Sequence, residues 1–97
     1  MFARITIVQG KKDKLDEAIK IYEDSIVTAA KAQKGFKAAY LLTNRNTGKA
    51  ISCTIWESEA DAVSNEDSGY YKEQVGKLKD FFTAPPEREG YEVSVQV

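Results

Sequence analysis

The side chains in this sequence that are best suited to bind a small molecule are aromatic and bear a hydroxyl or an indole N–H. Such groups donate hydrogen bonds from an otherwise apolar surface. The sequence has no histidine and one cysteine. It therefore excludes Ser-His-Asp and Cys-His catalysis, histidine-ligated haem and HExxH or CxxC metal sites, and we expect no metal and no cofactor. The candidate ligand-binding residues are Tyr22, Tyr40, Trp56, Tyr70 and Tyr71.

An enzyme built from these residues needs a proton acceptor other than histidine. Cys53 has the ordinary pKa nearest to neutrality, but it lies in mid-strand with no cation beside it, so we interpret it as a buried, inert thiol. The base would then be a carboxylate with a raised pKa or an assisted tyrosine. The periodicity indicates no buried carboxylate, which counts against an enzyme, and the residues alone leave catalysis open.

The elements that must position these side chains follow from the hydrophobic periodicity. Alternation of apolar and polar residues predicts strands over 2–9, 36–43, 50–56 and 89–97. The short segment 44–48 is rich in turn-forming residues and predicts a hairpin between the second and third strands.

Two helical regions separate these strands. Apolar residues at steps of three and four predict a helix that Asp13 caps and that ends before Gly35. A second region begins at Ser58, is interrupted over 64–69, and resumes near Ser68 until about Phe82. The order β-α-β-β-α-β predicts an α+β, ferredoxin-like domain over residues 1–97, with a four-stranded antiparallel sheet that carries helices on one face.

The other face of this sheet is predicted to be apolar as well. An antiparallel sheet with one solvated face shows polar residues at alternate positions, whereas the first three strands carry apolar residues at both parities. We expect a homodimer in which two sheets pack face to face, because an exposed apolar patch of this size is a liability. On the first strand, one face carries Ile5 and Ile7 and the other carries Phe2 and Val8. On the third strand, Ile51 and Ile55 share one face and Trp56 lies on the other. On the second strand, one face is predicted to carry Phe36, Ala38, Tyr40 and Leu42.

The composition of the chain indicates which partners and which cellular location to expect. The chain has 97 residues, 14 basic and 15 acidic side chains and a formal net charge of −1. Nucleic-acid binding favours a positive domain with a dense basic stripe, so we expect no nucleic-acid partner. No apolar run approaches the ~20 residues of a membrane span, and the N-terminal residues do not have the pattern of a signal peptide. We therefore expect no membrane association and a cytoplasmic location, which a single unpaired cysteine fits.

The chain resembles the antibiotic biosynthesis monooxygenase (ABM) family of dimeric α/β barrels. The similarity runs almost end to end and is clearest at Gly35-Phe36, in the segment 56–60 (Trp-Glu-Ser-Glu-Ala) and in the turn at 68–71. The resemblance implies a homodimeric barrel with a cleft between sheet and helices in each subunit. Some members oxidise polycyclic phenols with molecular oxygen and neither metal nor flavin, whereas others degrade haem.

The haem-degrading branch of this family is a poor match. Trp56 corresponds to the tryptophan of those enzymes, but Ala3 stands where they have an asparagine, and Val75 stands where they have the haem-ligating histidine. The resemblance therefore implies binding of a small aromatic, quinol- or anthrone-type molecule in the cleft, with cofactor-independent oxygenation. The alternative is a non-catalytic ligand-binding or structural dimer. Arg4, inside the first strand, is expected to form an interfacial ion pair with an acid of the last strand such as Glu92, and binding of an anion is the alternative.

Overall fold

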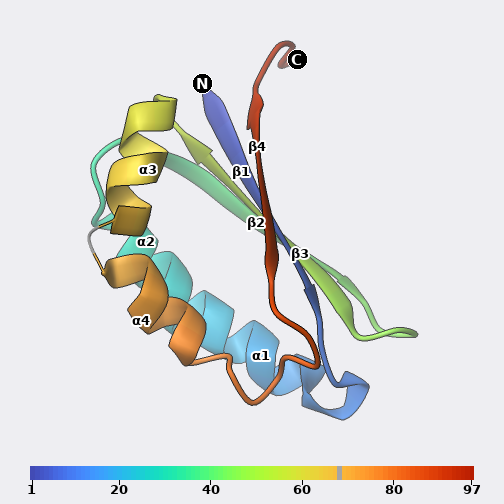
Figure 1. Cartoon of the computed structure of the whole chain (residues 1–97). Helices are drawn as coiled ribbons and strands as arrows, with labels where there is room; N and C mark the ends of the chain where they lie inside the picture. Colours follow the sequence, from blue (N-terminus) through green and yellow to red (C-terminus); the bar gives the residue numbers. More distant parts are fainter. Residues whose placement is uncertain (68) are drawn as a thin grey trace.

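Across the described residues, which are 1–67 and 69–97 of a computed structural model without the side chains of Tyr70 and Tyr71, one antiparallel sheet carries helices on a single face (Figure 1). The strands lie in the order β2-β3-β1-β4. This arrangement confirms the predicted α+β, ferredoxin-like fold. The strands are β1 (Phe2–Gln9), β2 (Phe36–Asn44), β3 (Lys49–Trp56) and β4 (Glu87–Glu92).

The first helical region is irregular where a single helix was predicted. It consists of the 3₁₀ turn η1 (Lys12–Lys14), α1 (Leu15–Ile21), the π-helical turn η2 (Tyr22–Ile26) and α2 (Val27–Lys31). Asp13 lies inside η1, and α1 begins without a side-chain cap, so the predicted cap at Asp13 is wrong. None of the helices in the described ranges is both long and apolar enough to cross a lipid bilayer.

The second helical region contains α3 (Glu59–Asp67) and α4 (Tyr70–Gly76). The hydroxyl of Ser58 accepts a hydrogen bond from the N–H of Asp61 at 3.2 Å, as predicted for a cap. The α3 helix continues through most of the predicted interruption, and the break falls beside Gly69, whose φ is +85°. The predicted restart at Ser68 lies outside the described residues.

The α4 helix is shorter than predicted because the chain must return to the end of β1. Tight turns follow Gly76, and the N–H of Lys11 donates to the carbonyl of Phe81 at 3.0 Å, while Thr83 N–H donates to the carbonyl of Gln9 at 2.9 Å. These contacts fix the turn segment against β1 before β4 starts. The last strand ends at Glu92, where it pairs with Phe2, and not at Val97 as predicted.

A bulge in β2 decides which side chains face the helices. The pairing with β3 shifts between Phe36, which is opposite Trp56, and Ala38, which is opposite Ile55. Phe36 therefore lies on the helix side, where its ring meets that of Trp56 edge to face at 5.7 Å. The prediction that Phe36 shares a face with Ala38, Tyr40 and Leu42 is wrong, because a bulge inserts one residue and reverses the alternation.

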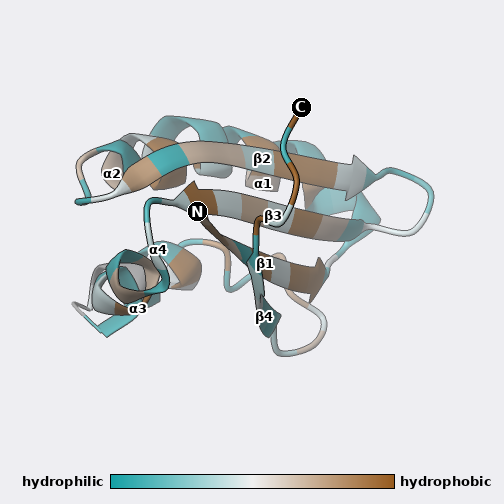
Figure 2. Ribbon diagram, turned by 90° about the horizontal axis from the view of Figure 1, so that it is seen from above, coloured by the Kyte–Doolittle hydropathy of each residue, from teal (hydrophilic) through white to brown (hydrophobic). Residues whose placement is uncertain are grey.

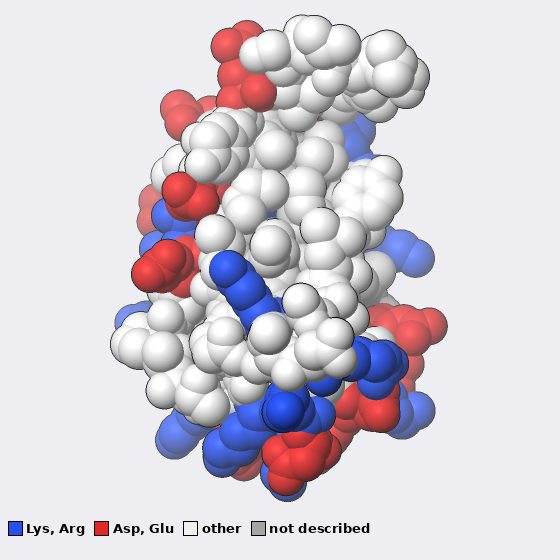
Figure 3. Space-filling model, turned by 90° about the vertical axis from the view of Figure 1, so that its right-hand side faces the viewer, with Lys and Arg blue, Asp and Glu red and all other residues white. Residues whose placement is uncertain are grey.

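The face away from the helices is apolar across three strands, as predicted. Apolar residues run along β1, β2 and β3, whereas β4 is mainly hydrophilic (Figure 2). Figure 3 shows this face, where uncharged atoms cover the centre and charged side chains gather mostly at the edges. Tyr40 and Leu42 are 57% and 56% exposed on it. The other outward-facing residues are Ala3, Ile5, Ile7, Ala38, Ile51, Cys53 and Ile55.

Candidate functional site

Six of the buried side chains form two separate hydrophobic clusters, and a cleft lies between the sheet and the helices. Phe2, Trp56 and Ala62 form one cluster, and Leu15, Ala18 and Phe81 form the other. Residues of both clusters line the cleft, which has ≈ 100 Å³ of room for the centres of water molecules. One water needs about 10–15 Å³ by this measure, so the cleft holds several waters or an organic molecule of one or two rings.

Hydroxyl groups mark the sheet side of this cleft. Thr6, Ser52 and Thr54 point toward the helices from β1 and β3, because they share the parity of Trp56 and Val8. A cleft with mainly apolar walls and a few placed hydroxyls is typical of a small-molecule site.

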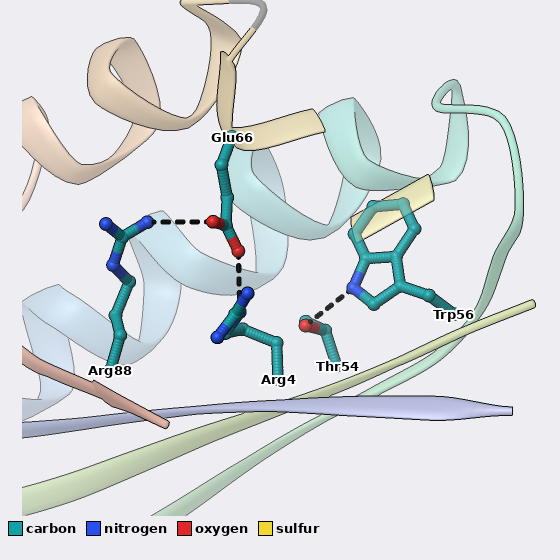
Figure 4. Close-up of polar contacts among 5 residues, drawn as sticks. All are labelled: Arg4, Thr54, Trp56, Glu66 and Arg88. Atoms are coloured by element: carbon teal, nitrogen blue, oxygen red, sulfur yellow. Dashed lines mark hydrogen bonds and ion pairs between the residues drawn. The ribbon is translucent and has the colours of Figure 1, made fainter. Parts of the chain in front are cut away.

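Two hydrogen bonds orient these hydroxyls. The Tyr22 hydroxyl and Ser52 Oγ lie 2.8 Å apart, and either atom can donate. The Trp56 indole N–H donates to Thr54 Oγ1 at 3.0 Å (Figure 4). Trp56 therefore presents its ring, and not a free N–H donor, to the cleft. Thr54 Oγ1, which accepts this bond, keeps its own O–H for a ligand or a water.

The π-helical turn brings Tyr22 to this wall. Tyr22 begins η2, and Ile26 at its end also lines the cleft. A π-helical turn inside an α-helix is rare and occurs frequently at functional sites. Burial raises the pKa of Tyr22 above its ordinary value of 10.0, and the bond to Ser52 offsets part of this rise. The phenol is thus a neutral hydrogen-bonding group at physiological pH.

A charged cluster borders the cleft on the side of α3. Glu66 extends from α3 between two arginines of the sheet (Figure 4). Its Oε1 lies 2.6 Å from Arg4 Nε, and its Oε2 lies 3.2 Å from Arg88 Nη1. The side chains of Arg4 and Glu66 are only 18% and 14% exposed. The expected partner of Arg4, Glu92, is therefore wrong: the nearest acid comes from the helix layer, and not from the neighbouring strand.

The structure brings together some of the predicted ligand-binding residues and separates one of them. Trp56 and Tyr22 both line the cleft, and both are buried. Tyr40 lies on the opposite face of the sheet, because the alternation of β2 after its bulge points it away from the helices. The side chains of Tyr70 and Tyr71 lie outside the described part of the structure, so their role stays a prediction.

Sequence reasoning missed the polar residues that α3 and α4 contribute. Asn65, Glu66 and Gln74 line the cleft, and Glu66 is the half-buried carboxylate that the periodicity did not reveal. The signal was present: Ala62, Asn65 and Glu66 are spaced as one face of a helix. The predicted interruption over 64–69 hid it, because those residues were assigned to a turn.

Replacing Tyr22 should change how stability depends on high pH. The folded chain holds the Tyr22 proton more tightly than the unfolded chain, so this contribution is fully present below the unfolded value of 10.0 and is lost as pH rises through the folded pKa. Tyr22→Phe has no such proton, and its free energy of unfolding should fall less steeply above pH 10. Urea unfolding across this pH range measures the difference.

A matched control for this experiment is Ser52→Ala, which keeps the phenol and removes its hydrogen-bond partner. Since that bond lowers the pKa of Tyr22, the variant should lose stability above pH 10 at least as steeply as the unmodified protein. The pKa values of Cys53 and Tyr91 are also raised, by burial and by Glu89 respectively, but both groups remain in every variant. If the free energy of unfolding falls equally steeply above pH 10 in Tyr22→Phe and in the unmodified protein, the raised pKa of Tyr22 is not the cause of that fall.

Solved structures share this arrangement over nearly the whole chain. A Deinococcus radiodurans protein classed with the antibiotic biosynthesis monooxygenases has a TM-score of 0.81 at 10% identity, covering 100% of this chain and 96% of its own. The chain has the ABM fold. A monooxygenase from the ActVA-Orf6 gene of Streptomyces coelicolor, solved with nanaomycin D, has a TM-score of 0.76 at 13% identity, covering 99% and 89%. SnoaB, a cofactor-independent oxygenase from Streptomyces nogalater, has a TM-score of 0.76 at 10% identity, covering 99% and 95%.

Sequence relatives add no activity to this fold. Uncharacterised proteins from two strains of Mycobacterium tuberculosis are 31% identical over 64 residues, which are 66% of this chain. The chain spans only 29% of the length of these relatives. No protein-family model matches the chain. The low identity to the ABM structures establishes the fold and leaves the reaction to be argued from the cleft.

Proposed function

We propose that the cleft binds a small, largely aromatic molecule of the quinol or anthrone type and oxygenates it with molecular oxygen, without metal or flavin. The observation that carries this proposal is the open cleft between the two buried clusters, where a tryptophan ring, apolar walls and a row of hydroxyls face the same space. The ABM fold supports the reaction class, since SnoaB, a structure with this fold, is named a cofactor-independent oxygenase.

The chemistry in this proposal comes largely from the substrate. Removal of a proton from an anthrone leaves an electron-rich enolate that reacts with oxygen. One oxygen atom becomes the new ring carbonyl, and the other leaves as water with the two hydrogens of the methylene carbon. Glu66 is the proton acceptor, because it is the one carboxylate among the described residues that line the cleft. Thr54 and one hydroxyl of the Tyr22–Ser52 pair donate hydrogen bonds to substrate oxygens, since the other hydroxyl of that pair donates within it. The ring of Trp56 packs against the aromatic system.

Oxygen uptake with anthrone and a series of quinols tests this function. We expect uptake above the rate of the uncatalysed reaction, and a loss of about tenfold or more in Trp56→Phe, because misplacing a bound substrate by a small distance is costly. Tyr40→Phe serves as the control, since Tyr40 lies on the other face of the sheet. The absence of protein-dependent uptake across the panel would contradict the enzyme.

The second candidate is a non-catalytic ligand-binding protein with the same cleft. The lone tryptophan of the chain, Trp56, lines this cleft, so its fluorescence reports occupancy directly. Saturable quenching by these compounds without oxygen uptake would favour this candidate over the enzyme. Saturable quenching together with uptake would favour the enzyme.

We also propose that a second copy of the chain covers the uncovered face of the sheet. Three strands present apolar side chains there, and a face of this kind packs against another sheet in a two-layer arrangement. The closely opposed rows Tyr40–Cys53–Ile5 and Leu42–Ile51–Ile7 run across the sheet and provide a continuous surface. The corresponding test is the mass of the protein in solution.

A further inference from the structure

The charged cluster at the border of the cleft joins two arginines to one carboxylate. Arg4 and Arg88 flank Glu66, and of the two arginines Arg4 is the one whose side chain lines the cleft. Among the described residues that line the cleft, Arg4 and Glu66 are the charged ones.

Arg4 is largely buried and its side chain lines the cleft. Its guanidinium lies over the ring of Phe2, with Cζ 5.2 Å from the ring centroid, and its Nε meets Glu66. A guanidinium has five N–H donors in a planar fork, and the contact with Glu66 is made through Nε. In the described part of the chain, the recorded partners of Arg4 are Glu66 and Phe2.

Arg88 makes it feasible for Arg4 to bind a ligand. Removing the only partner of a buried carboxylate strongly destabilises the fold, because the charge is left buried and unpaired. Glu66 keeps Arg88 as a partner through its other oxygen, and Arg88 is 43% exposed and so partly solvated. An anion that binds Arg4 therefore does not leave Glu66 unpaired.

We propose that the ligand carries an anionic oxygen, a carboxylate or a phenolate, and that Arg4 binds this oxygen through the N–H groups that Glu66 does not use. This inference rests on the proposed function, because it specifies the class of aromatic molecule that the cleft binds. Arg4 then acts as the residue that determines specificity: it selects anionic over neutral aromatic molecules and orients them with the charged group toward α3. Charge-assisted hydrogen bonds to a guanidinium are short and directional, which suits this role.

Calorimetric titration with matched naphthalene compounds tests the inference. The probes are 2-naphthoate, which carries a carboxylate, its neutral analogue 2-naphthamide, and 2-naphthol measured on both sides of its own pKa. We expect 2-naphthoate to bind at least about tenfold more tightly than 2-naphthamide. A gain in 2-naphthol affinity on ionisation identifies the phenolate as a ligand group, and its absence assigns the site to carboxylates.

Three variants separate recognition from folding. Arg4→Met should abolish the preference for 2-naphthoate, whereas Glu66→Gln, which removes the competing carboxylate, should increase it several-fold. These opposite changes are not expected from general loss of structure. Arg4→Lys keeps the charge and should retain part of the preference. Arg45→Gln is the matched control, because Arg45 forms an exposed ion pair with Asp16 and does not line the cleft.

The results distinguish failure of this inference from failure of the proposed function. Equal affinity for 2-naphthoate and 2-naphthamide would overturn the role of Arg4 and leave aromatic binding intact. Failure of every probe to bind would overturn both. A preference that persists in Arg4→Met would also overturn the inference.

Discussion

Trp56→Ala is expected to lower the free energy of unfolding by about 3–5 kcal/mol, the usual range for truncation of a buried tryptophan. Trp56 is 2% exposed, packs with Phe2 and Ala62, and contacts the ring of Phe36 edge to face. It belongs to one of only two buried clusters in the described residues, so no neighbouring core compensates for its loss. Because a domain of this size has a total stability of about 5–15 kcal/mol, the variant should be close to unfolding.

Thermal unfolding followed by circular dichroism measures this loss, at one protein concentration because association would shift the midpoint. A change of 1 kcal/mol moves the midpoint by about 4–8 °C in a domain of this size, so the expected shift exceeds ten degrees. Val63→Ala is the control, since Val63 is exposed on α3 next to buried Ala62. A loss below about 1 kcal/mol in Trp56→Ala would show that this cluster does not stabilise the fold.

Leu42→Lys is expected to convert the proposed dimer into a monomer. Leu42 is more than half exposed in one chain and lies at the end of an apolar row that continues through Ile51 and Ile7. A lysine placed between two packed sheets must lose its hydration without an opposite charge to pair with. Static light scattering after size-exclusion chromatography should give twice 10.8 kDa for the unmodified protein and 10.8 kDa for the variant.

Thr43→Lys provides the matched control for this experiment. Thr43 neighbours Leu42 on β2 but points to the helix side of the sheet. The Thr43→Lys substitution therefore adds the same charge on the face that is not expected to contact a second chain. We expect this control to keep the mass of the dimer. If the unmodified protein is monomeric at micromolar concentration, the proposed dimer is wrong. If the Leu42→Lys protein stays dimeric, the two chains do not pack through this face of the sheet.

The order of elements could be predicted from the sequence because each strand has a two-residue period and the hairpin at 44–48 is rich in turn formers. The predictions failed where tertiary contacts override a local pattern. The alternation through Val93, Val95 and Val97 is typical of a strand, but β4 ends at Glu92, where its partner β1 begins. Likewise, α4 ends at Gly76 because the following turn is fixed to β1, although the apolar spacing continues to Phe82.

The site was predictable only in part, since period alone does not indicate which of two apolar faces encloses a cleft. Trp56 and Tyr22 line the cleft, whereas Tyr40, which has the same chemistry as Tyr22, lies on the opposite face of the sheet. The pairing of Arg4 with Glu66 joins residues 62 positions apart and depends on how α3 crosses the sheet. No local pattern contains that information.

The gap between the two buried clusters has a thermodynamic consequence. Part of the apolar surface of the sheet and helices is not covered by protein atoms, so a molecule that fills the cleft completes the core. Ligand binding and resistance to heat are therefore linked: a compound present at a hundred times its dissociation constant adds about 2.7 kcal/mol to the native state. A melting-temperature screen of metabolites can thus reveal the natural ligand even when no reaction has been observed.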